Sequence, residues 1–366
     1  MPISRNSWKD SRVSKLLGIR YPIIQGPFGG LNSIQLAADV SNAGGMGSYG
    51  AQPLSPTDIV RTVAAIRSQT GDPFAINLWV STYDTEAQSI SQKRIDEAVS
   101  SIHHYFQGLN LPLPQAPTFV LQDFAAQADA LLEARPPVAS FVFGVPDKGL
   151  LDACRRQNIL TIGTATTPDE AMVLEEAGLD LVVASSFEAG GHRGSFLAPA
   201  EVSLTGMISL LPQVVDRVAV PVIAAGGIAD GRGIAAAFAL GAEAVQIGTA
   251  FLPCSGSGIN PTHRKALLSE AANATGLTKA FTGRLARGIR NRLFEEFDNT
   301  CFEALPYPVQ RHLLSPYMQA AIEAERVDLL SMWAGQSAPL IEHIEVVPLM
   351  QSLIEQTDRV FQSFSL

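Results

Sequence analysis

The sequence has few cysteines, a deficit of positive charge and no long apolar run. Cys154, Cys254 and Cys301 are too far apart for a metal site or a disulfide framework, so free thiols in a reducing compartment are expected. The formal net charge of -9 argues against a nucleic-acid partner, because phosphate binding relies on Lys and Arg. No segment is long enough to span a membrane, and residues 1–20 lack the apolar centre of a secretory signal. A cytoplasmic protein is expected, and its oligomeric state is not indicated.

What the sequence does contain is a regular alternation of short and long apolar patterns. Of its 366 residues 46% are hydrophobic and 17% are charged, which suits a large buried core. Short β-branched runs alternate with segments of helical period, which predicts parallel strands joined by helices. Eight strands are expected, at residues 22–25, 47–50, 74–80, 141–145, 160–164, 181–185, 222–225 and 244–247. The predicted fold class is therefore α/β, a (β/α)8 TIM barrel.

Two regions interrupt this alternation. Residues 81–137 are interpreted as an insertion after the third strand, and residues 254–340 as an additional helical and loop segment after the eighth. The barrel would then consist of residues 1–253 and 341–366. Within the second region, the spacing of Arg284, Arg287 and Arg290 predicts one face of a helix. Ion pairs with nearby carboxylates, such as Glu295 and Glu296, or the steering of an anion are the two interpretations.

Glycines follow the two last strands. Gly226 and Gly227 end the seventh strand, and Gln246-Ile247-Gly248-Thr249 spans the end of the eighth. These junctions form the usual phosphate site of such a barrel, because free backbone N–H groups favour an anion and glycine lets it approach. Tight turns without a ligand are the simpler alternative. Phosphate binding is favoured because both junctions carry the pattern.

A histidine lies in the glycine-rich loop after the sixth strand, in the run Gly190-Gly191-His192-Arg193-Gly194. This position predicts an imidazole at the barrel mouth, where a histidine with a pKa near neutrality can take a proton from an acidic C–H group. A structural histidine is the alternative. Glu188 could orient His192 or cap the loop, and Arg193 could attract an anionic substrate or form a surface ion pair.

Polar side chains also occur on early strands. Gln25 and Gly26 end the first strand, and Asn77 lies inside the apolar third strand. A buried amide needs hydrogen-bond partners. A heteroaromatic ligand or the surrounding core could supply the partners of Asn77, and the sequence does not decide between them.

These motifs together resemble those of the nitronate monooxygenases, formerly called 2-nitropropane dioxygenases. The resemblance covers nearly the whole chain. It is carried by the runs at 22–27, 188–194, 221–228, 246–249, 286–291 and 333–336, together with Asn77. The Gly-Gly-His-Arg-Gly loop in combination with Gln-Ile-Gly-Thr is the specific part, whereas each alone is a weak signal.

The resemblance implies FMN, bound without a covalent link, and no metal. It implies that His192 is the catalytic base. The implied cofactor-binding residues are Gln25, Gly26, Asn77, Ser185, Gly190, Gly227, Gln246, Ile247, Gly248 and Thr249. Gln25 and Gly26 would line the isoalloxazine ring. Many members carry Gln where this chain has Ser185-Ser186, and a serine hydroxyl has a shorter reach than an amide.

The implied reaction is the oxidative denitrification of alkyl nitronates to carbonyl compounds and nitrite, with O2 as the oxidant. His192 would remove the α-proton of neutral nitroalkanes. The alternatives are an FMN-dependent NAD(P)H reductase of the same superfamily, of the enoyl-ACP reductase or quinone reductase type, a non-catalytic flavin-binding protein, and a sugar-phosphate barrel enzyme without flavin. The run at 333–336, Trp-Ala-Gly-Gln, favours the monooxygenase.

Overall fold

The molecule is built around a parallel sheet whose strands follow one another around a barrel. A computed structural model describes residues 8–31, 33–81, 84–114, 122–299 and 303–363. The sheet has the order β1-β9-β8-β6-β5-β4-β3-β2. Its strands are β1 (Ile23–Gln25), β2 (Gly47–Gly50), β3 (Phe74–Trp79), β4 (Val138–Val142), β5 (Leu160–Ala165), β6 (Leu181–Ser185), β8 (Val222–Ala225) and β9 (Ala244–Ile247). Between β1 and β2, the N–H of Gln25 donates to the carbonyl of Met46 at 2.9 Å, which closes the barrel.

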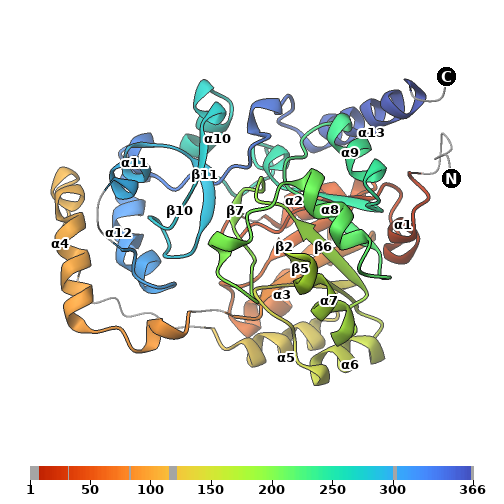
Figure 1. The fold of residues 1–366 in the computed structure, drawn as a ribbon, viewed down its shortest axis with the longest axis horizontal. Coiled ribbons are helices and arrows are strands. Elements are labelled where there is room, and N and C mark those ends of the chain that lie inside the picture. Colours follow the sequence, from red (N-terminus) through yellow and green to blue (C-terminus); the bar gives the residue numbers. More distant parts are fainter. Residues whose placement is uncertain (1–7, 32, 82–83, 115–121, 300–302, 364–366) are drawn as a thin grey trace.

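Helices cover the outside of this barrel (Figure 1), which confirms the predicted (β/α)8 class. They are α2 (Ile34–Asn42), α3 (Pro56–Arg67), α5 (Phe124–Ala134), α6 (Lys148–Arg156), α7 (Pro168–Ala177), α8 (Met207–Val215), α9 (Gly231–Ala239) and α13 (Val346–Ser363). The fourth strand begins and ends three residues earlier than expected. Its extended backbone stops because Phe143 and Gly144 both have positive φ, of 65° and 150°.

The two ends of the barrel differ in chemistry. A short helix, α1 (Arg12–Leu17), places Val13 and Leu17 in one apolar cluster with Val138, Leu181 and Ala244, each the first residue of its strand. The N-terminal ends of the strands are therefore plugged with apolar side chains. The opposite ends carry the glycines and polar residues singled out in the sequence, as is usual for barrels of this class.

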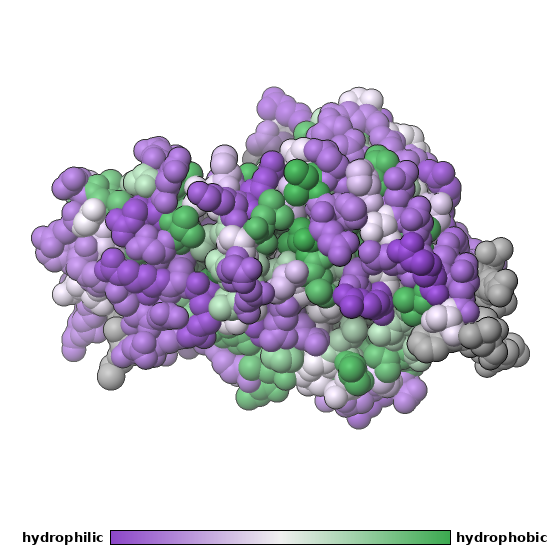
Figure 2. Space-filling model, turned by 90° about the horizontal axis from the view of Figure 1, so that it is seen from above, coloured by the Kyte–Doolittle hydropathy of each residue, from purple (hydrophilic) through white to green (hydrophobic). Residues whose placement is uncertain are grey.

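Beside the barrel lies a side lobe, made of residues 85–108, 261–299 and 303–330. It contains α4 (Gln92–Gly108), α10 (Pro261–Leu267), α11 (Arg292–Asp298), α12 (Val309–Glu323), β10 (Thr275–Thr278) and β11 (Ala286–Ile289). Figure 1 shows α4, α11 and α12 on the left, away from the barrel. From above, hydrophobic residues gather along the middle of the molecule, between the hydrophilic outer surface of the lobe and the barrel (Figure 2).

The two interrupting regions do not behave alike. The segment before β4 is shared, since α4 packs against α12 of the lobe whereas α5 packs against α3 and β3 of the barrel. The predicted division into residues 1–253 with 341–366 and residues 254–340 stays a prediction. α13 packs against α9 and α2 and supplies the last helix around the barrel. Among the described residues, no helix combines the length and apolar character needed to cross a membrane.

The predicted helix carrying Arg284, Arg287 and Arg290 is wrong. Residues Ala286–Ile289 form β11, which pairs antiparallel with β10 and with the short strand β7 (Gly191–His192). The strand is favoured because Gly288 allows close packing: a Cβ there would lie 2.7 Å from the carbonyl oxygen of Met332. The three arginines therefore do not lie on one face of a helix. The expected ion pair is present for one of them, since Arg290 pairs with Glu295 at 3.8 Å.

Candidate active site

His192 lies on β7, in the loop that follows β6. β7 pairs with β11, and the N–H of Arg193 donates to the carbonyl of Leu285 at 2.9 Å. Gly191 has a φ of 77°, a conformation that glycine adopts without strain. The loop is also tight at Gly190, where a Cβ would lie 2.6 Å from the N atom of Gly335. The side lobe and the 333–336 run therefore fix the backbone of this histidine.

The ring of His192 is enclosed by aromatic rings. The ring centroids of Trp79, Trp333, Tyr307 and Phe143 lie 5.4, 5.5, 6.0 and 6.4 Å from that of His192. Trp79 ends β3, Phe143 follows β4, and Tyr307 belongs to the side lobe. We call these four residues the aromatic cage. Its members come from four separate segments, and the cage replaces water on most sides of the imidazole.

The cage changes the proton affinity of the imidazole. The pKa of His192 is lowered to about 3, first by desolvation and then by the positive charges of Arg284 and Arg311. The sequence suggested a pKa near neutrality, and the difference follows because rings and cations, rather than water, surround the imidazole. His192 is thus neutral at pH 7 and has a lone pair available to accept a proton.

Two arginines supply positive charge to this region. The Nε of Arg284 lies 2.9 Å from Oδ1 of Asp84, and its guanidinium carbon lies 4.3 Å from the ring centroid of Phe143 and 4.6 Å from that of Tyr307. Arg311 donates to the hydroxyl of Tyr307 at 3.2 Å. Cations held against aromatic faces in this way are attracted by the ring quadrupole. A small anion beside His192 would therefore meet favourable charge.

The glycine junctions after β8 and β9 present free backbone donors. Within the described residues, no hydrogen bond engages the N–H groups of Gly227, Gly248 and Thr249. A Cβ on Gly248 would have only Phe28 within 4 Å, at 3.6 Å, so the space beside it is open. The hydroxyl of Thr249 accepts the N–H of Gly335 at 2.9 Å and keeps its own proton to donate. These groups form a cradle suited to a phosphate.

Most of the other predicted site residues end neighbouring strands. Register pairs Gln25 with Ile247, Gln246 with Ala225, and Ala225 with Ser185. Gly26 continues this row, since its N–H donates to the carbonyl of Ile247 at 2.9 Å. Gln25, Gly26, Ser185, Gln246 and Ile247 are therefore brought together at one side of the barrel mouth.

Asn77 lies on β3, which β2 separates from β1 in the closed barrel. Its Nδ2 donates to the carbonyl oxygen of Ser140 at 3.2 Å and to the hydroxyl of Ser140 at 3.0 Å. The protein itself therefore satisfies this donor, which favours the core interpretation for the amide nitrogen. Gln25 is likewise occupied: its Oε1 accepts the N–H of Ser48 at 3.0 Å and its Nε2 donates to the carbonyl of Gly26.

Neither interpretation of Arg193 is correct. Its side chain is 2% exposed and donates to three backbone carbonyls, those of Ser186 at 2.5 Å, Ser185 at 3.1 Å and Ser203 at 3.1 Å. It is a buried clamp on the loop, because backbone oxygens rather than solvent surround it. Desolvation lowers the pKa of Arg193 to about 10.

Of the two roles suggested for Glu188, the structure shows capping. Its Oε2 accepts the hydroxyl of Ser186 at 2.6 Å and the N–H of Met207 at 2.7 Å. Met207 is the first residue of α8, whose N-cap, Gly206, has no side chain to do this. The partner of the His192 ring is a different residue, Thr282, whose Oγ1 lies 2.9 Å from Nε2 of His192.

Sequence reasoning missed this partner, the cage and the position of Arg284. Thr282, Arg284 and Tyr307 lie 90 or more residues after His192, in a region expected to be helical, so no local pattern joins them to it. Trp79 carried a usable signal, because an aromatic residue at the C-terminal end of a barrel strand faces the mouth.

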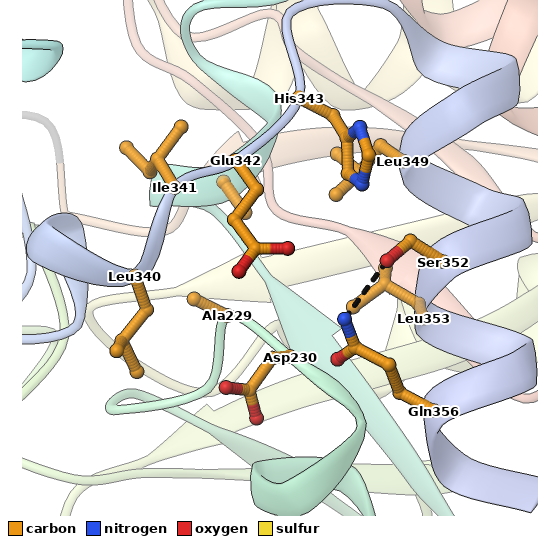
Figure 3. Close-up of a pocket in the computed structure, with 11 residues that line it drawn as sticks. Ala229, Asp230, Leu340, Ile341, Glu342, His343, Leu349, Ser352, Leu353 and Gln356 are labelled. Carbon is orange, nitrogen blue, oxygen red and sulfur yellow. Dashed lines mark hydrogen bonds between the residues drawn. The ribbon is translucent and has the colours of Figure 1, made fainter.

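Two cavities lie away from His192. One, of about 10 Å³, is lined by residues that include Asp230, Glu342 and Ser352, and it has room for about one water molecule (Figure 3). The other, of about 390 Å³, lies in the side lobe between α4, α11 and α12 and is lined by residues that include Tyr105, Leu293 and Leu314. Among the described residues, no group of three or more His, Cys, Asp or Glu is placed to hold a metal ion.

Comparisons with known proteins agree with this geometry. A family model described as "Nitronate monooxygenase" matches residues 10–356. A probable nitronate monooxygenase of Staphylococcus aureus (strain JH9) is 38% identical over 356 residues, which cover 97% of this chain and 99% of the relative.

Solved structures are similar over the same length. Nitroalkane oxidase from Streptomyces ansochromogenes superposes with a TM-score of 0.88 and 34% identity, over 96% of this chain and 99% of that one. FabK from Thermotoga maritima superposes with a TM-score of 0.74 and 27% identity, over 97% of this chain and 98% of that one. Sequence and backbone are thus similar to these proteins from end to end.

Proposed function

The chain belongs to the nitronate monooxygenase family and is an oxidoreductase, and we propose that it oxidises alkyl nitronates to carbonyl compounds and nitrite, with O2 as the oxidant and FMN as the cofactor. The observation that carries this proposal is a neutral histidine beside two arginines at the glycine-rich end of the barrel. This combination suits a substrate that either is an anion or becomes one when it loses a proton.

The strand ends fit the proposed cofactor. The free N–H groups of Gly227, Gly248 and Thr249 would hold the phosphate of FMN, and the open space beside Gly248 would admit it. Gln25, Gly26, Asn77, Ser185, Gly190, Gln246 and Ile247 would complete the site. Bound FMN would supply the redox chemistry, which is the movement of electrons from the substrate to O2.

The protein's own part is to bind the substrate and to manage a proton. With a neutral nitroalkane, His192 would accept the α-proton, since its imidazole is unprotonated at pH 7. The nitronate that forms is an anion, so it would raise the pKa of the adjacent imidazolium and hold the proton there. Arg284 and Arg311 would stabilise the developing negative charge. The aromatic cage would exclude bulk water from the transfer.

The test compares two substrates in one variant. His192→Asn should lower kcat/KM for a neutral nitroalkane by about 10²- to 10⁴-fold, the usual contribution of a general base. Oxidation of the preformed nitronate needs no base and should continue. The measurement is O2 uptake with nitroethane and with ethyl nitronate, on protein whose visible spectrum shows bound flavin.

Two results would overturn the proposal. Unchanged turnover of the neutral nitroalkane by His192→Asn would refute the role of the base. A yellow wild-type protein that oxidises NADH but ignores nitronates would refute the function and favour the reductase alternative.

A further inference from the structure

The two nitrogens of the His192 ring lie in different surroundings. Nε2 lies 2.9 Å from Oγ1 of Thr282. Nδ1 has no hydrogen-bond partner among the described residues, and it is not one of their fully buried polar atoms that lack a partner. Nδ1 is therefore accessible. A neutral imidazole carries its proton on one nitrogen and its lone pair on the other, and the partner of the first decides which is which. Which nitrogen of the His192 ring can act as the base therefore depends on Thr282.

Thr282 has more than one contact. Its hydroxyl, on a side chain that is 7% exposed, lies 3.3 Å from the carbonyl oxygen of Arg284 and accepts the N–H of Arg284 at 3.4 Å. A hydroxyl has one proton and two lone pairs. If its proton points to the carbonyl of Arg284, the lone pairs accept from Arg284 N–H and from His192 Nε2–H, and only the lone pair of Nδ1 stays without a partner.

The opposite arrangement leaves more groups without partners. If Thr282 donated to Nε2, the carbonyl of Arg284 would lose this donor and Nδ1 would carry the ring proton. Nδ1–H would then have no acceptor within the described residues. Proton uptake at Nδ1 would also be impossible, because its lone pair would be absent.

We infer that Thr282 is a positioning residue that holds His192 as the Nε2–H tautomer, so that Nδ1 is the atom that accepts the substrate proton. This inference rests on the proposed function, because it names the basic atom of the proposed base. It also gives the protonated ring a partner: when Nδ1 takes up a proton, Nε2–H still donates to Thr282.

The turn that carries Thr282 is held firmly. Gly283 has a φ of 89°, its N–H donates to the carbonyl of Lys279 at 2.9 Å, and a Cβ on it would lie 2.2 Å from the carbonyl oxygen of Leu305. β11 begins three residues later and pairs with β7. The side lobe therefore fixes both the backbone of His192 and the hydroxyl that orients its ring.

The experiment uses the flavin-loaded enzyme and two substrates. Thr282→Val keeps the shape of the side chain and removes the hydroxyl, whereas Thr282→Ser keeps the hydroxyl. We expect Thr282→Val to lower kcat/KM for nitroethane by about 10- to 100-fold and that for ethyl nitronate by less than about threefold. Thr282→Ser should recover most of the loss. If the valine variant does not fold, Thr282→Ala compared with Thr282→Ser gives the same contrast.

The matched control is Thr161→Val. Thr161 is another buried threonine, 3% exposed, whose hydroxyl donates to Asp180 at 2.7 Å near the start of β5. Removing this hydroxyl costs a hydrogen bond to a carboxylate, at the start of β5 and so at the end of the strand away from the mouth. Its activity ratio between the two substrates should equal that of the wild type, even where its melting temperature falls.

The outcomes distinguish a failure of the tautomer assignment from a failure of the proposed base. Equal losses on both substrates, or a serine variant no better than the valine variant, would show a structural role and overturn the tautomer assignment. If His192→Asn loses nitroethane turnover while Thr282→Val keeps it, the base stands and this inference fails. If His192→Asn keeps nitroethane turnover, the proposed base itself fails.

Discussion

The barrel and the side lobe contribute to the candidate site in different ways. The barrel provides backbone: the free N–H groups of Gly227 and Gly248, at strand ends where glycine leaves room for a ligand. The lobe provides side chains: Thr282, Arg284 and Tyr307, which contact the ring of His192 or lie close to it. We therefore expect changes on the barrel side to affect stability and cofactor binding, and changes in the lobe to affect proton transfer.

The largest expected effect concerns the barrel side of the loop. Arg193→Met would leave the carbonyls of Ser185, Ser186 and Ser203 without their buried donor. A buried acceptor left without its donor costs about 1–3 kcal/mol, so the three carbonyls together should cost at least about 3 kcal/mol. The free energy of unfolding, measured by urea denaturation, should fall by that amount.

A surface arginine gives the matched control for this change. Arg217 pairs with Asp169 at 2.7 Å, with a side chain that is 50% exposed. Exposed pairs contribute less than about 1 kcal/mol, so Arg217→Met should be nearly silent. Similar losses of unfolding free energy in Arg193→Met and Arg217→Met would show that the buried hydrogen bonds of Arg193 do not stabilise the loop.

An intermediate effect is expected at the phosphate cradle. Gly248→Ala should leave the fold intact, because the added Cβ has no neighbour closer than 3.6 Å and Gly248 has an ordinary φ of -100°. The methyl group would, however, stand in the space proposed for the phosphate. We expect the affinity for FMN to fall by about 10- to 100-fold, since backbone N–H contacts need close approach.

Fluorescence titration of the apoprotein with FMN measures this loss, and the melting temperature of the apoprotein reports on the fold. Gly71→Ala is the control, because a Cβ at Gly71 meets nothing within 4 Å and Gly71 precedes the start of β3, at the end of the barrel opposite the proposed cradle. Unaltered FMN affinity in Gly248→Ala would place the cofactor elsewhere. The backbone N–H groups at these strand ends would then have no part in binding it.

The barrel and the side lobe also differ in how far their structure could be predicted from the sequence. The barrel was predictable because each strand and helix carries its own local period, and because glycines at Gly226 to Gly227 and at Gly248 mark the junctions. His192 was found for the same reason, since two glycines precede it in the chain.

The lobe was not predictable, because its role depends on pairing over long distances. β11 has buried side chains throughout rather than an alternating pattern, and its three-residue arginine spacing imitates a helix. The contact of Thr282 with His192 spans 90 residues. Arg193 was misread because a sequence does not show that backbone carbonyls, rather than water, surround a charged residue.

The smallest expected effect tests the lobe's charge on His192. Arg284 lowers the pKa of His192, so Arg284→Met should raise that pKa, but only in part, because desolvation is the larger cause of the shift and Asp84 already offsets part of the arginine charge. The base works only when neutral, so the acidic limb of kcat/KM for nitroethane should move to higher pH. Because the pKa of His192 is about 3, profiles of O2 uptake must extend down to about pH 2.5 to measure this shift.

Arg290→Met is the control for this shift, because Arg290 pairs with Glu295 and its guanidinium lies over Phe294, outside the aromatic cage. Its profile should coincide with that of the wild type. A limb that moves to lower pH in Arg284→Met would mean that the arginine favours the protonated ring, which repulsion between two cations does not allow. The lobe would then act on His192 through packing alone. The barrel would still bind the cofactor, but the charges of the lobe would not set the pKa of His192.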